Sequence, residues 1–260
     1  MKIVVGVKAV LNPSGIAVNR RAGQVTIQRE EVLMDPAAKH ALEAALRLKD
    51  ALGAEVIALA VGAERAEDVL CQALGMGADQ AIGVRDAALS RADAGVVTRA
   101  LARAVEHIGG VALVLVGERA LDTSDGQVGP RLAEALGWPL LSRALRLEVN
   151  GTTLRTVTQR GREYIAQEAD LPAVVTIPRD SHPPRYAHAG RLLQAYRDGL
   201  VTTWSVADLG LDAASLAPLV QVRGAVVPPE RELGVRLTGT AEEVAAKLAG
   251  QLYERLGLRR

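Results

Sequence analysis

Residues 111–137 read VALVLVGERALDTSDGQVGPRLAEALG. Residues 111–116 form an uninterrupted apolar run, which is typical of a strand buried on both faces of a parallel sheet. A polar, glycine-containing segment follows at once, and then a helical pattern in which Leu132, Ala133 and Leu136 share one face. Strand, loop and helix in this order are the repeating unit of α/β proteins. The loop is therefore expected at the carboxyl end of a parallel strand, where such folds bind ligands.

The same alternation runs back to the N-terminus. Strands are expected at 2–8, 55–61 and 80–84, and helices at 36–51, at 64–75 and after residue 90. Asp35 and Pro36 suit the cap and first position of a helix, and Ser90 with Asp93 has capping-box spacing. Alternating residues around 16–27 indicate a hairpin. Because crossovers between parallel strands are right-handed, residues 1–140 predict a doubly wound parallel α/β sheet with helices on both faces.

An antiparallel extension is expected from residue 141 onward. The alternating residues 145–149 lead to Asn150-Gly151, a strong hairpin signal, and 154–158 return. Further strands are expected at 164–169 and 172–177, followed by prolines that break regular structure. The remaining chain predicts a loose stretch over 201–229 and a C-terminal helix capped by Thr240 and Glu243.

Composition excludes several classes of protein. The 260 residues carry 31 Lys+Arg against 30 Asp+Glu, a formal charge of +1, which argues against binding to nucleic acid or an anionic membrane. No apolar run approaches the roughly 20 residues of a membrane helix, and Lys8 interrupts the apolar N-terminus, so neither membrane insertion nor a signal peptide is expected. Cys71 is the single cysteine, which excludes an internal disulfide and fits the cytoplasm.

Residues for catalysis are scarce. Cys71 lacks an adjacent base, and Walker A, G-x-S-x-G and H-E-x-x-H motifs are absent from the sequence. Metal-ligand spacing is absent from the four histidines, His40, His107, His182 and His188. His40 and His107 lie in expected helices and are interpreted as helix surface. We expect no catalytic residue and no metal site, and hence no autonomous enzyme.

The loop 117–130 has the features of an anion cradle. Gly126 and Gly129 allow close approach of the backbone, and the N–H groups at the start of the next helix can hold a phosphate. A polar connection between strand and helix explains the same residues equally well. Asp122 and Asp125 need an explanation under either interpretation, because carboxylates repel a phosphate unless they cap the helix or bond a ribose hydroxyl.

Six stretches of the chain resemble the β subunit of electron-transfer flavoproteins. They are VGVK (5–8), EAALRLK (43–49), ALGMGADQAI (73–82), LVLVGERALDTSDGQVGPRLAEALGWP (113–139), LPAVVTI (171–177) and PRY (184–186). A glycine-rich loop alone would be weak evidence, whereas six stretches in the same order and spacing are specific.

The resemblance implies a heterodimer with an α subunit, in which one FAD is shared but bound mainly by α, and β buries an AMP. Electrons would pass from flavin dehydrogenases, such as acyl-CoA dehydrogenases, through FAD to a membrane quinone oxidoreductase. AMP would undergo no reaction and would stabilise the native state by binding it. By position, the AMP site would comprise Gly6, Asp35, Pro36, Ala37, Ala38, Val61, Leu113, Gly117, Glu118, Arg119, Ala120, Leu121, Asp122, Thr123, Ser124, Asp125, Gly126, Gln127 and Val128.

Within that site, the resemblance places Gly6 and Val61 beside the adenine, and the N–H groups of 126–128 on the phosphate. Asp122 and Ser124 are candidates for contacts with hydroxyls. The chain departs from the family at 161–165, which replace an acidic, glycine-rich strand region, and at Pro13, which replaces an aromatic residue.

The segment after the PRY motif is the expected docking surface for a dehydrogenase. Ala189 stands where the family has an anchoring leucine, so Leu192, Leu193 and Tyr196 would form the apolar face instead. Packing of this helix on the chain's own core is the alternative. These expectations divide the chain into a nucleotide-binding α/β domain with its antiparallel extension, residues 1–180, and a docking segment with a C-terminal arm, residues 181–260.

Three other functions stay open. A bifurcating member of the same family would hold a second FAD in place of AMP. A free-standing ATP-binding regulatory domain of the universal-stress type shares the doubly wound architecture, although the extension and the long tail argue against it. A nucleotide-activating ligase is third, but the chain has no Ser-Gly-Gly pyrophosphate loop.

Overall fold

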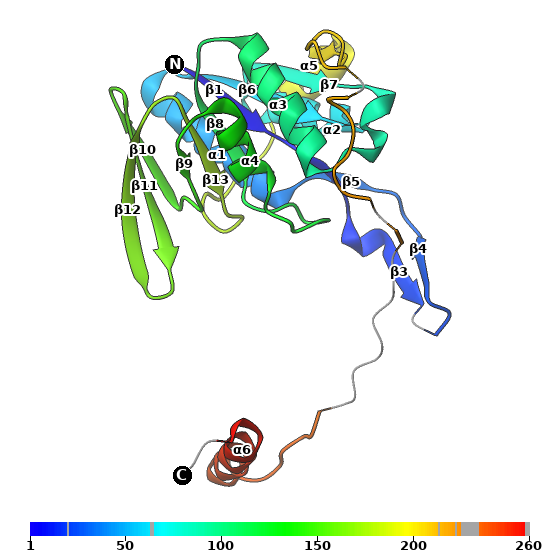
Figure 1. Cartoon of the computed structure of the whole chain (residues 1–260), viewed down its shortest axis with the longest axis vertical. Coiled ribbons are helices and arrows are strands. Elements are labelled where there is room, and N and C mark those ends of the chain that lie inside the picture. The colour runs from blue at the N-terminus through cyan, green and yellow to red at the C-terminus, as the bar shows by residue number, and fades with distance from the viewer. Residues whose placement is uncertain (20, 63–64, 213, 222, 225–233, 258–260) are drawn as a thin grey trace. The chain divides into compact units, whose positions relative to one another are not determined.

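The computed structural model describes residues 1–19, 21–62, 65–212, 214–221, 223–224 and 234–257 (Figure 1). By packing, the chain falls into two units. Unit 1 comprises Met1–Ala17 and Thr26–Arg223, and unit 2 comprises Val18–Val25 and Gly224–Arg260. The division at residue 180 in the sequence analysis separates segments by role rather than by packing, and it stays a prediction.

A seven-stranded parallel sheet forms the centre of unit 1. In chain order its strands are β1 (Lys2–Gly6), β6 (Glu55–Val61), β7 (Gln80–Val84), β8 (Val111–Gly117), β9 (Leu140–Leu141), β13 (Ala173–Ile177) and β14 (Val201–Trp204). Their spatial order is β14-β7-β6-β1-β8-β13-β9, and neighbouring strands pair in parallel. The doubly wound α/β fold is thereby confirmed.

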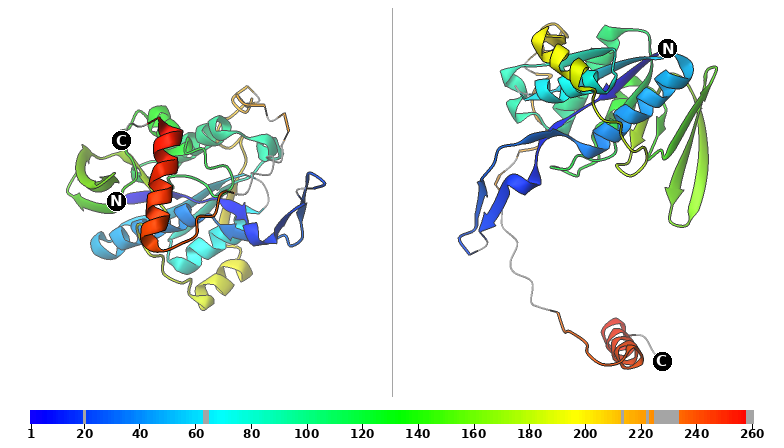
Figure 2. Two further views of the ribbon diagram at one scale, coloured as in Figure 1. Left: turned by 90° about the horizontal axis from the view of Figure 1, so that it is seen from below. Right: turned by 180° about the vertical axis from the view of Figure 1, so that it is seen from behind.

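Helices cover both faces of this sheet, as Figure 2 shows. Helices α1 (Pro36–Leu52) and α2 (Ala66–Met76) pack on one face, and α3 (Ala94–Ile108) and α4 (Val128–Leu136) pack on the other. Alternate residues of a strand point to opposite faces, so Leu113 and Leu115 belong to the first apolar layer, and Val114 and Val116 to the second. Both layers are aliphatic, because the chain contains no Phe.

The helix starts follow their capping residues. The Asp35 carboxylate accepts hydrogen bonds from the N–H groups of Ala37 and Ala38, which confirms the predicted cap of α1. The predicted capping box at Ser90 is wrong. A short 3-10 helix, η2 (Ala87–Arg91), occupies that position, and Asp93 caps α3 by accepting from Val96 N at 2.9 Å.

The antiparallel extension is a three-stranded sheet of β10 (Arg146–Asn150), β11 (Thr153–Arg160) and β12 (Glu163–Asp170). The predicted turn at Asn150-Gly151 joins its first two strands, and Gly151 has φ +60°, a conformation that favours glycine. The extension ends earlier than predicted. Strand β13 was expected to continue it, but β13 pairs in parallel with β8 and β9, because its five buried residues suit a central position.

The stretch 201–229 is less loose than expected. Its first four residues form β14, which pairs in parallel with β7 at one edge of the sheet. This strand is short and half-exposed, so it lacks the continuous apolar pattern of a central strand. The rest of that stretch includes residues 213, 222 and 225–229, which lie outside the described residues.

Smaller elements complete the two units. Strands β2 (Ala9–Leu11) and β5 (Val32–Met34) pair with each other, as do β3 (Ile16–Asn19) and β4 (Gln24–Ile27), the predicted hairpin. A 3-10 helix, η1 (Pro13–Gly15), lies between β2 and β3. Unit 2 contains α6 (Ala241–Leu256), which begins with the predicted capping box of Thr240 and Glu243. In the described ranges, no helix has the length and apolar character needed to cross a membrane.

Candidate functional site

The carboxyl ends of β1 and β8 mark the point where the order of the strands in the sheet reverses. The two strands are neighbours, with Gly6 opposite Val116, but the chain proceeds from β1 toward β6 and from β8 toward β13. Open α/β sheets bind ligands in the crevice at such a switch point. Gly6 and Gly117 end these two strands, and Val61 ends β6, so three predicted site residues lie at this edge.

Asp35 connects the elements around the switch point. Its side chain is almost fully buried, and in addition to capping α1 its Oδ2 accepts a hydrogen bond from Leu121 N at 2.7 Å. Its own backbone N–H donates to the carbonyl oxygen of Lys8 at 2.8 Å. Asp35 therefore joins the end of β1, the start of α1 and the loop after β8. Because both carboxylate oxygens are engaged, Asp35 shapes the site and is poorly placed to bind a ligand with its side chain.

A cavity of about 330 Å³ lies beside this junction. Its volume falls in the range of about 300–1,000 Å³ that is usual for small-molecule sites. Eight of the predicted residues line it: Asp35, Pro36, Ala37, Glu118, Arg119, Ala120, Leu121 and Ser124. The lining also includes four residues that the sequence analysis missed: Arg143, Pro178, Arg179 and Asp180.

The missed residues bring charge to the cavity. Arg143 Nε lies 3.2 Å from Glu118 Oε1, and its backbone N–H donates to Thr176 Oγ1 at 2.8 Å. Arg179 lies 3.8 Å from Asp180. Residues 178–180 directly follow β13, so recognising β13 as a parallel strand would have predicted them at the same sheet edge.

The glycines of the loop have structural explanations that need no ligand. A Cβ on Gly117 would lie 2.9 Å from the Cβ of Ala37, and a Cβ on Gly129 would collide with Thr176. Gly126 has φ +65°, which L residues rarely adopt. Close packing and backbone conformation thus require glycine at these positions, and the glycines alone do not indicate a phosphate.

The two aspartates that needed an explanation are both engaged. Asp122 Oδ1 lies 2.7 Å from Lys8 Nζ, and Asp125 Oδ1 accepts from Gln127 N at 3.4 Å, just before α4. The remaining predicted residues do not line the cavity: Gly6, Ala38, Val61, Leu113, Gly117, Asp122, Thr123, Asp125, Gly126, Gln127 and Val128. Leu113 lies in the core with its side chain fully buried. The AMP site as a whole stays a prediction.

Comparisons with known proteins identify the family. The model of the electron transfer flavoprotein domain matches residues 23–209. The electron transfer flavoprotein subunit beta of Clostridium acetobutylicum is 32% identical over 216 residues, which is 83% of each chain. The chain belongs to the electron transfer flavoprotein beta-subunit family. This membership decides against the universal-stress and ligase alternatives.

Other relatives extend over almost the whole chain. A mitochondrial electron transfer flavoprotein subunit beta of Oryza sativa subsp. japonica is 33% identical over 250 residues, 94% of this chain and 96% of its own. CarD of Acetobacterium woodii, a subunit of a caffeyl-CoA reductase-Etf complex, is 31% identical over 260 residues, 98% of this chain and 99% of its own. Electron transfer flavoprotein beta subunits are electron carriers that pair with an alpha subunit and work with a flavin.

The segment that is expected to dock the electron transfer flavoprotein on a dehydrogenase contains helix α5 (Ala189–Arg197), which packs on α2. Leu192 faces α2, since a Cβ on Gly75 of that helix would lie 3.2 Å from the Cβ of Leu192. Leu193 points away and is 69% exposed. Tyr196 is also exposed, and its hydroxyl hydrogen-bonds to Asp68 Oδ1 at 2.9 Å. One predicted anchor, Leu192, therefore packs on the chain itself, whereas Leu193 is free to contact a partner.

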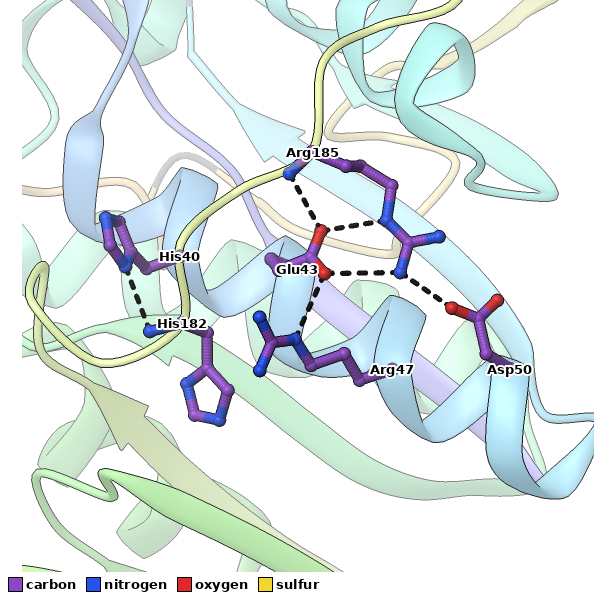
Figure 3. A network of polar contacts seen from close by, with 6 residues as sticks. All are labelled: His40, Glu43, Arg47, Asp50, His182 and Arg185. Carbon is purple, nitrogen blue, oxygen red and sulfur yellow. Dashed lines mark hydrogen bonds and ion pairs between the residues drawn. The ribbon is translucent and has the colours of Figure 1, made fainter.

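A polar network fastens the segment before α5 to helix α1 (Figure 3). The buried carboxylate of Glu43 accepts two hydrogen bonds from the Arg185 guanidinium, at 2.9 and 3.2 Å, and one from its backbone N–H. Arg47 and Asp50 extend the network, with Arg47 Nε 3.1 Å from Glu43 and Arg185 Nη2 2.7 Å from Asp50. Although burial raises the pKa of Glu43, the hydrogen bonds from Arg185 outweigh it and hold that pKa below its usual range.

Two histidines adjoin this network. His40, interpreted as helix surface, is half-buried, and its Nδ1 accepts from the backbone N–H of His182 at 3.2 Å. Burial, followed by the charges of Arg47 and His40, lowers the pKa of His182 to about 4. Among the described residues, no cluster of three or more His, Cys, Asp or Glu side chains is arranged to hold a metal. Cys71 is buried in α2.

Proposed function

We propose that this chain is the β subunit of a heterodimeric electron-transfer flavoprotein that binds AMP as a structural ligand. The observation that supports this most directly is the cavity at the switch point. Eight of the residues that the resemblance assigns to AMP line this cavity. Its volume is suited to a mononucleotide. AMP would bind the native state only and would stabilise it by mass action.

The redox chemistry would belong to FAD, because cofactors carry such reactions and the protein positions them. The sequence has no G-x-G-x-x-G fingerprint at a strand end, so an α subunit would supply most contacts to FAD. The heterodimer would accept electrons from flavin dehydrogenases, such as acyl-CoA dehydrogenases, and pass them to a membrane quinone oxidoreductase. We place this activity in the cytoplasm.

The bound nucleotide tests the proposal. The chain is co-expressed with an α subunit, and the purified yellow heterodimer is denatured in acid. We expect one AMP and one FAD per heterodimer in the released nucleotides, identified by mass spectrometry. A folded heterodimer that releases FAD but no second nucleotide would refute the structural role of AMP.

A second FAD in the β site is the competing function, as in a bifurcating member. Two observations favour it: the lining of the cavity includes Arg143 and Arg179, which are not among the residues assigned to AMP, and one relative is named as part of a reductase complex. The same acid release distinguishes the two, since this alternative requires two FAD and no AMP.

A further inference from the structure

Lys8 and Asp122 form an ion pair between the segments that follow β1 and β8. Lys8 is the second residue after β1, Asp122 lies in the loop after β8, and Nζ and Oδ1 are 2.7 Å apart. The backbone of Lys8 is also fixed, because its carbonyl oxygen accepts from Asp35 N. Both side chains keep more than 40% of their surface exposed, so solvent and ligands can reach the pair.

The loop around this pair is rich in carboxylates that would repel a phosphate. It contains Glu118, Asp122 and Asp125, and the Arg119 guanidinium is turned toward Glu118 at 3.4 Å. Lys8 lies close to this loop although it comes from another strand. A lysine ammonium has three N–H donors, and Asp122 takes one of them, so two can bind a further acceptor.

We propose that Lys8 is the side-chain cation that binds the phosphate of the nucleotide, and that Asp122 holds Lys8 at the crevice while competing with the phosphate for its charge. This inference rests on the proposed function, since it concerns the same nucleotide. Neither Lys8 nor Asp122 lines the cavity, but Lys8 is joined through its carbonyl oxygen to Asp35, which does. It also gives Asp122 a role different from bonding a ribose hydroxyl: the carboxylate keeps Lys8 in place before the ligand arrives.

The test uses heterodimer from which the bound nucleotide of the β subunit has been removed, and measures how far added AMP and adenosine raise its melting temperature, from which the two apparent affinities follow. Because a hydrogen bond between charged groups contributes more than a neutral one, Lys8→Met should lower the affinity for AMP about tenfold or more. The affinity for adenosine, which has no phosphate, should stay unchanged. Asp122→Asn should have the opposite effect and tighten AMP relative to adenosine, because it removes the competitor for Lys8.

Lys2→Met is the matched control. Lys2 begins the same strand, but its ammonium bonds the carbonyl oxygens of Ile108 and Gly109 at the opposite end, so AMP binding should not change. Lys8→Arg keeps the charge and should retain most of the affinity, which separates the loss of charge from misfolding.

Each other outcome has a defined meaning. Lys8→Met could lower the affinities for AMP and adenosine equally, or Asp122→Asn could lower the affinity for AMP. Either result would show that the ion pair only holds the loop in place and would overturn the inference. AMP binding that Lys8→Met does not affect would also overturn it. If the folded wild-type heterodimer, stripped of its β-subunit nucleotide, responds to neither ligand, the proposed function itself fails.

Discussion

Asp35 is a case in which one side chain serves three backbone N–H donors. Two of them belong to the first turn of α1 and one to Leu121 in the loop after β8. An amide in place of the carboxylate would turn an NH2 group toward one of these donors, so asparagine cannot replace it well. The shape of the site thus depends on a residue that need not touch the ligand.

We therefore expect Asp35→Ala to lower the free energy of unfolding by about 2–3 kcal/mol, since it removes a helix cap and leaves a buried N–H without a partner. Urea denaturation measures this loss. Asp86→Ala is the control, because Asp86 makes a single exposed capping bond, to Ala88 N, and should cost about 1 kcal/mol or less. Equal losses would mean that the bond to Leu121 contributes nothing.

Glu43→Gln should cost about 3 kcal/mol at neutral pH, because it leaves Arg185 without its buried partner. The folded-state pKa of Glu43 is lowered, so its contribution to stability is present above its unfolded pKa of about 4.3 and disappears as the pH falls through the folded value. The variant should thus be less sensitive to acid below about pH 4.3. Glu163→Gln, at an exposed position of β12, should leave the stability at neutral pH unchanged.

His182 should make the stability of the fold depend on pH in a higher range than Glu43 does. Its pKa is about 4 in the folded state against about 6.5 when unfolded, so the chain loses stability as the pH falls between these values. His182→Gln should flatten the dependence of the unfolding free energy on pH over that interval. A slope that persists in His182→Gln would mean that another group takes up the proton.

At the scale of elements, helix α5 presents two adjacent leucines with different roles, one for packing on the chain itself and one for docking. Leu192 lies against α2 at Gly75, and Leu193 faces outward. The Glu43–Arg185 pair fixes the segment that leads into the helix, and His188 N donates to Gly75 O at 2.8 Å. The outward face is therefore presented by a helix that is held at its beginning.

Leu193→Ala should slow electron transfer from the dehydrogenase while leaving AMP, FAD and heterodimer assembly intact, because loss of a buried interface anchor costs about 2 kcal/mol or more. Leu192→Ala should instead lower the melting temperature of the heterodimer. Stopped-flow reduction and thermal unfolding measure the two effects. Normal transfer in Leu193→Ala would place the docking surface elsewhere.

Local sequence signals predicted most helices and strands, but they could not predict contacts between segments that are distant in the sequence. The cap at Asp35, the turn at Asn150-Gly151 and the box at Thr240 each depend on neighbours within a few residues, so they could be predicted. Strand β14 could not, because four half-exposed residues carry little periodicity. The pairing of Lys8 with Asp122 depends on the order of strands in the sheet, which no single segment encodes.

At the scale of the whole molecule, the stability of unit 1 should be independent of the C-terminal helix. Helix α6 belongs to unit 2, whereas the buried residues of both apolar layers lie in unit 1. Deleting residues 224–260 should change the free energy of unfolding of unit 1 by no more than about 0.5 kcal/mol, as expected for surface changes. Denaturant unfolding of the isolated chain checks this, and a larger loss would show that α6 belongs to the core.

The order of the strands also gives the molecule two internal optical reporters. The sheet ends at β14 on one side and at β9 on the other, and the two tryptophans of the chain mark these ends. Trp204 lies in β14, with its ring 4.8 Å from that of His107, and Trp138 immediately precedes the short segment that leads into β9. Since no other residue emits in the same range as indole, replacing either tryptophan leaves a single fluorescent indole at a known edge of the sheet. Fraying of the two margins can then be followed separately by fluorescence.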